Sequence, residues 1–86
     1  MQFQGALIRE QGITFAVVVV QKHIVDNPTT AREAVASFRP AFPGVPIVLM
    51  AQDHSGRPTY YGRQDVARFL ANTPIGAIPW RSFTLQ

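Results

Sequence analysis

The residue types that could bind a ligand gather in residues 45–70. An apolar run there reaches a glycine-containing turn, returns through two adjacent tyrosines and opens a helical pattern. Tyrosine rings offer faces for stacking, and arginines hold phosphates and carboxylates through paired hydrogen bonds. A helix start adds unpaired backbone N–H groups. We therefore predict a surface for nucleic acid or another anion, made of five residues: Arg57, Tyr60, Tyr61, Arg63 and Arg68.

Ordinary structural roles explain the same stretch without a ligand. Alternation along a strand sends one of Tyr60 and Tyr61 to the core and leaves the other exposed, and the sequence does not say which. Asp65 is then a first-turn acid that the helix dipole favours, next to solvated arginines. The segment GRPTYYGR also does not match the strand motif of ribonucleoprotein domains.

A second candidate anion site lies before the first helix. Asn27, Thr29 and Thr30 could present N–H and hydroxyl donors to an anion at the end of the valine-rich strand. No glycine-rich loop is present to bring the backbone close to a phosphate. A plain helix cap explains the same residues.

Metal binding and acid–base chemistry could draw on two pairs of residues, His23 with Asp26 and Asp53 with His54. Neither pair has the ligand spacing of an established metal site, and turn propensity alone accounts for Asp53. The chain has no cysteine, which excludes disulfides, thiolate catalysis and cysteine-ligated metals. We therefore predict no catalytic residue, no metal and no cofactor, and expect that the protein is not an enzyme.

Composition and length place the chain among small folded domains. Its 86 residues suffice for a single domain, predicted to span residues 1–86, and its net charge of +3 is mild for a nucleic-acid binder. The apolar run at residues 13–20 is far shorter than the roughly 20 residues of a membrane-spanning helix. No signal peptide is visible, and the absence of cysteine fits a reducing compartment. We expect a cytoplasmic protein with no membrane partner.

The sequence predicts seven secondary-structure elements in the order β-β-α-β-β-α-β. Apolar and β-branched runs predict the strands, and proline and glycine separate the elements. An apolar stripe at helical spacing predicts each helix, at i, i+3, i+4 and i+7 in the first and at i, i+3 and i+4 in the second. The predicted strands span residues 2–9, 13–21, 47–50, 58–61 and 78–85, and the predicted helices span residues 27–38 and 62–72. Pro79 should place the last strand at a sheet edge.

These elements predict an α+β fold with a mixed sheet of four to five strands and two helices on one face. Without its first strand, the order is that of ferredoxin-like split βαβ folds, which are therefore possible. That arrangement would put the apolar run at residues 47–50 on an edge, although its composition is typical of a central strand. The competing topology has this strand parallel and adjacent to the strand at residues 13–21.

The valine-rich strand bears directly on function. Residues 15–20 (FAVVVV) are apolar on both faces, whereas two helices on one face would leave the other face wet. A second copy of the chain could cover that face, and the chain's own termini are the alternative. We therefore predict a non-enzymatic binding or assembly module that forms a homodimer through its sheet. The alternative is a weak nucleic-acid or anion binder that uses the arginine and tyrosine surface.

Overall fold

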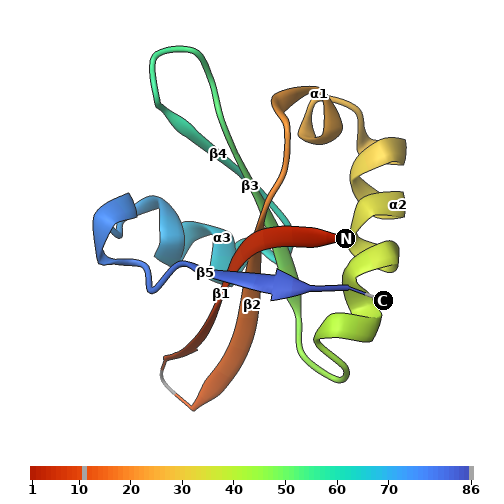
Figure 1. Cartoon of the computed structure of the whole chain (residues 1–86). Helices are drawn as coiled ribbons and strands as arrows, with labels where there is room; N and C mark the ends of the chain where they lie inside the picture. The colour runs from red at the N-terminus through yellow and green to blue at the C-terminus, as the bar shows by residue number, and fades with distance from the viewer. Residues whose placement is uncertain (11, 86) are drawn as a thin grey trace.

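A five-stranded mixed sheet runs through the middle of the molecule, with helices on both of its faces (Figure 1). The computed structural model describes residues 1–10 and 12–85. The elements are β1 (Gln2–Glu10), β2 (Ile13–Val19), α1 (Lys22–Val25), α2 (Pro28–Phe38), the 3-10 helix η1 (Arg39–Ala41), β3 (Ile47–Gln52), β4 (Pro58–Tyr61), α3 (Gln64–Ala71), the 3-10 helix η2 (Ile75–Ala77) and β5 (Arg81–Thr84). The predicted α+β class and mixed sheet are confirmed.

The strand order is β4-β3-β2-β1-β5. β1 and β2 form an N-terminal hairpin, and β2 pairs in parallel with β3, while the other neighbours are antiparallel. A ferredoxin-like sheet would separate β2 from β3 by another strand, so the competing topology is the observed one. The apolar β3 lies inside the sheet, and β5, which follows Pro79, lies at an edge as predicted.

The two long helices lie on opposite faces of the sheet, so the prediction of two helices on one face is wrong. Successive residues of β2 alternate between two apolar clusters. Ala16 and Val18 pack in the cluster that contains the α2 residue Phe38, whereas Val17 packs in the cluster that contains the α3 residue Leu70. Figure 1 shows α2 and α3 on either side of the sheet.

Topology explains this placement of the helices. The segment from β2 to β3 joins neighbouring parallel strands, so it crosses one face and carries α2 over it. The segment from β4 to β5 must instead travel from one sheet edge to the other. It crosses the face that α2 leaves open, and α3 with Ile78 and Trp80 packs there. The apolar residues on both sides of β2 are therefore covered by the chain itself.

Local hydrogen bonds fix the ends of the elements that border the site. The Asn27 side chain accepts a hydrogen bond from the Thr29 N–H and caps α2, which begins with Pro28. In the β3–β4 hairpin, the Asp53 carbonyl accepts from the Gly56 N–H and the Asp53 N–H donates to the Arg57 carbonyl. Gly56 has a φ of +86°, which suits a type I turn followed by a one-residue bulge. The short helices α1, η1 and η2 were not predicted.

Among the described residues, no helix has both the length and the apolar character needed to cross a bilayer.

Candidate functional site

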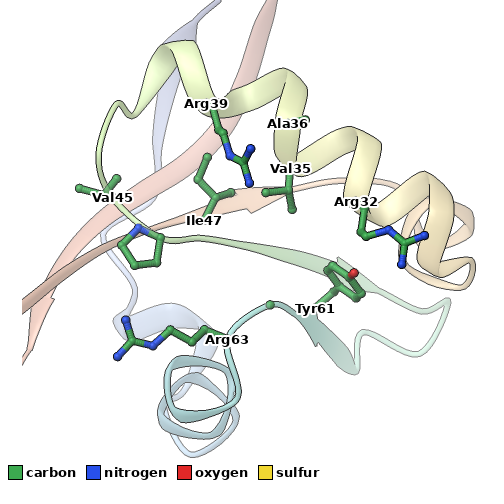
Figure 2. Close-up of a pocket in the computed structure, with 10 residues that line it drawn as sticks. Arg32, Val35, Ala36, Arg39, Val45, Ile47, Tyr61 and Arg63 are labelled. Carbon is green, nitrogen blue, oxygen red and sulfur yellow. The ribbon is translucent and has the colours of Figure 1, made fainter.

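A groove of about 520 Å³ lies between α2 and the segment that leads from β4 into α3 (Figure 2). We call it the arginine groove, because three arginines line it. One wall comes from α2 and η1, the floor from the start of β3, and the other wall from the end of β4. Its lining residues are Arg32, Val35, Ala36, Arg39, Val45, Pro46, Ile47, Tyr61, Gly62 and Arg63.

The helical spacing of α2 builds the first wall. Arg32, Val35, Ala36 and Arg39 fall at i, i+3, i+4 and i+7, so they share one side of the helix. Arg32 and Arg39 are separated by about 10.5 Å along the helix axis. Both arginines are exposed, and among the described residues neither has a carboxylate within ion-pair distance. Their guanidinium groups are therefore available for a ligand.

The second wall is held in place by a close backbone approach and by an ion pair. A Cβ at Gly62 would lie 2.9 Å from Val48 Cγ2, and the Gly62 φ of +156° also disfavours side chains. Arg63 donates from Nε and Nη2 to the two carboxylate oxygens of Asp65, both at 2.9 Å. This pair holds the pKa of the Asp65 carboxyl below its ordinary value of 3.8. The Arg63 side chain is 52% exposed, so the pair is screened by solvent and adds little stability.

The groove combines a cationic rim with an apolar interior. Ile47 is buried at the floor, and Val35 and Val45 are partly buried beside it. Figure 2 shows Arg32 and Arg39 on the helix side and Tyr61 and Arg63 on the strand side. The titratable lining residues are three arginines and one tyrosine, and the described lining holds no carboxylate and no imidazole. The arrangement suits binding of an anion that also carries apolar groups.

Only two of the five residues predicted for the arginine and tyrosine surface meet in this groove, Tyr61 and Arg63. Tyr60 points to the sheet face that α3 covers and packs against the apolar cluster that contains Leu70, called the second cluster below. Arg68 is exposed on α3, and Arg57 is exposed in the β3–β4 loop. The groove therefore holds two of the five residues, and ligand binding by the other three stays an untested prediction.

The two tyrosines do lie on opposite faces, as the strand alternation predicted, but both are partly buried. The expected contrast between a core tyrosine and an exposed one is not found. The Tyr60 hydroxyl is buried with no hydrogen-bond partner among the described residues, and burial raises the pKa of this group. Tyr61 faces the groove.

The second predicted anion site has its donors in use. The Thr29 N–H donates to Asn27 Oδ1 at 2.8 Å. The Thr30 hydroxyl lies 2.9 Å from the Ile24 carbonyl and 3.0 Å from the Asn27 carbonyl. These contacts are those of a helix cap, the alternative explanation of the same residues. Anion binding here stays an untested prediction.

The histidine and aspartate pairs also have local partners. Asp26 pairs with Lys22 one helical turn away. Asp53 accepts hydrogen bonds from the Ser55 hydroxyl and from the Arg57 N–H, which hold the pKa of its carboxyl below its ordinary value. Within residues 1–10 and 12–85, no group of three or more potential metal-ligating side chains comes together.

Arg32 and Arg39 are the site residues that sequence reasoning missed. A signal for them was present, because they flank the apolar stripe of α2 at a spacing of seven residues. That spacing predicts a shared helix face but does not say what lies opposite. Only the strand order brings Tyr61 and Arg63 to the other side of the same groove.

Comparisons of this chain with protein-family models, with curated proteins and with solved structures found no match.

Proposed function

We propose that this protein is a non-enzymatic binding module whose arginine groove holds an anionic ligand bearing phosphate or carboxylate groups. The observation that carries the proposal is the pair Arg32 and Arg39, two guanidinium groups without an ion pair among the described residues, set beside an apolar floor. Guanidinium groups match the geometry of phosphate and carboxylate oxygens. Arg63 adds a third cation that Asp65 already shares.

This proposal narrows the anion-binding alternative drawn from the sequence. It keeps Tyr61 and Arg63, replaces the remaining members with Arg32 and Arg39, and leaves Arg57, Tyr60 and Arg68 outside the site. A single-stranded oligonucleotide is one anion among several under this proposal. The bases of such an oligonucleotide would find a single aromatic ring in the groove, that of the partly buried Tyr61. Proteins that bind single strands usually stack several successive bases on aromatic side chains, so the groove suits this ligand poorly.

Titration followed by amide NMR spectra tests the proposal. Pyrophosphate and citrate, added in about 50 mM salt, should shift the amide signals of residues 32–39 and 61–63, and about 200 mM salt should weaken the effect. The double variant Arg32→Gln, Arg39→Gln should lose the shifts. Arg68→Gln, which removes an equal exposed charge from α3, should retain them. Shifts that survive the double variant, or that follow any arginine equally, would refute the groove as the site.

Self-association stays a prediction whose original argument no longer holds, because α3 covers the face that was expected to need a partner. The feature left in its favour is Leu7, which is 48% exposed on β1. Sedimentation velocity at micromolar concentrations tests it, and a mass that stays monomeric across the series would end the idea. A cytoplasmic location is likewise proposed and can be checked by cell fractionation.

A further inference from the structure

We propose that the ligand of the arginine groove is an extended acidic peptide segment that adds as a strand to the free edge of β4. This inference rests on the proposed function, because it uses the same groove and the same cations. Its support comes from three features: an open strand edge on β4, the strand that also places Tyr61 in the groove, a spacing of the groove arginines that suits an extended chain, and an apolar floor between those arginines.

The edge of β4 is open. β4 ends the sheet and pairs only with β3. The hydrogen bond from the Asp53 N–H to the Arg57 carbonyl fixes which residues face β3. Since hydrogen-bonded pairs alternate along an antiparallel ladder, Thr59 and Tyr61 bond to β3, and the N–H and C=O of Tyr60 point to the open side. No other described element donates to or accepts from the backbone of Tyr60.

The charges of the groove match an extended chain better than a compact anion. Arg32 and Arg39 lie about 10.5 Å apart along α2. In an extended peptide, side chains on one face recur about every 6.8 Å, so the first and fifth residues are about 13.6 Å apart. Long guanidinium side chains can close the remaining difference. A small anion could engage only one end of the groove at a time.

The apolar floor between Arg32 and Arg39 favours an apolar residue in the middle of the peptide. Val35, Ile47 and the ring of Tyr61 present apolar surface there. The third residue of the segment would meet this surface, on the same side as the acidic first and fifth residues. The second and fourth residues would point away. The structure thus favours the pattern acidic, any, apolar, any, acidic, with backbone hydrogen bonds to Tyr60 adding affinity.

A labelled pentapeptide with glutamate at both ends, valine in the centre and threonine between them is the probe. Fluorescence anisotropy should show saturable binding that weakens at higher salt. A peptide of the same composition with adjacent glutamates and terminal valine should bind at least about tenfold more weakly. A version N-methylated at every amide from its second to its fifth residue should lose a similar factor, because it can no longer donate hydrogen bonds to a strand edge. Equal binding of the three peptides would overturn strand addition.

Two further measurements locate the peptide. Hydrogen exchange of the Tyr60 amide should slow in the complex with the pentapeptide and stay unchanged with citrate, which has no backbone to offer. The variant Ala36→Glu, at an exposed position of the groove wall, should weaken peptide binding at least about tenfold through charge repulsion. Ser37→Glu, one residue away and outside the lining, is the matched control and should bind normally.

The outcomes separate this inference from the proposed function. If pyrophosphate and citrate shift the groove signals but the pentapeptide does not bind, the peptide inference fails and the anion-binding module stands. If the pentapeptide binds with no change in Tyr60 exchange, strand addition is wrong. If no anion of any kind acts on residues 32–39 and 61–63, both fail together.

Discussion

The variant Leu70→Ala tests whether α3 holds the second face of the sheet. Leu70 is fully buried, with 0% of its surface exposed, and packs in the cluster with Val17, Val48 and Val66. If α3 is an integral layer, truncation of this side chain must weaken the whole fold. If α3 were only loosely placed, the loss would be small.

The expected loss follows from the burial of the side chain. The three carbon groups removed from a fully buried leucine cost about 2.4 kcal/mol in transfer free energy alone. The cavity left behind raises the total to about 3–5 kcal/mol, since fully buried positions relax least. A domain of this size has a free energy of unfolding of about 4–13 kcal/mol, so the variant should lose a large part of it. The midpoint of thermal unfolding should fall by roughly 4–8 °C per kcal/mol.

Urea unfolding, followed by the fluorescence of Trp80, measures the loss. Trp80 is the single tryptophan of the chain and packs against the second cluster. Leu7→Ala is the matched control, because Leu7 is 48% exposed, and it should cost less than about 1 kcal/mol. Equal small losses in the two variants would refute the two-face arrangement and restore the need for a partner. If Leu70→Ala does not fold, Val66→Ala gives the same test with a smaller truncation.

Three other predictions concern the ends of elements and the wall of the groove. Asn27→Ala should lower the free energy of unfolding by about 1 kcal/mol through loss of the α2 cap, whereas Thr29→Ala, which keeps its backbone donor, should change it less. Asp53→Asn should lower the free energy of unfolding at neutral pH, because the pKa of the Asp53 carboxyl is depressed in the folded state. The stability that the ionised carboxylate contributes is fully present above its ordinary pKa of 3.8, and it disappears as the pH falls through the lower folded-state pKa. Denaturation curves between about pH 5 and pH 2 should therefore converge for this variant and the wild type, and a constant gap would contradict the assignment. Gly62→Ala should cost about 1–3 kcal/mol in chemical denaturation, because its Cβ would lie 2.9 Å from a β3 valine methyl, while Gly76→Ala, with nothing within 4 Å, should be close to neutral.

Local chemistry explains which parts of the fold were predictable. The β-branched run of β2, the alternation of β1 and the proline-bounded stripe of α2 each carry their own period, and all three elements formed where expected. Turn residues placed the β3–β4 hairpin for the same reason. The short helices α1, η1 and η2 were missed because they are too short to show a period.

The site was less predictable than the fold. Sequence proximity grouped Tyr60 with Tyr61, but the pleat of β4 separates them onto opposite faces. Proximity also grouped Arg63 with Arg68, although Arg68 lies on α3 outside the groove. Arg39 belongs to the site through its place in space alone, since it lies 24 residues before Arg63 in the chain. Ligand-binding groups are brought together by tertiary packing, which local patterns do not record.

The sequence by itself determined the five strands, the two longer helices and the apolar character of both sides of β2, and it favoured an inner position for β3. These depend on periodicity and on residue type, which act over a few neighbouring residues. Only the tertiary structure decided what covers the second face. The connection from β4 to β5 must cross the whole sheet, and it carries α3 over the side that α2 leaves free. The start of the same connection lies across a groove from α2, and three arginines line that groove.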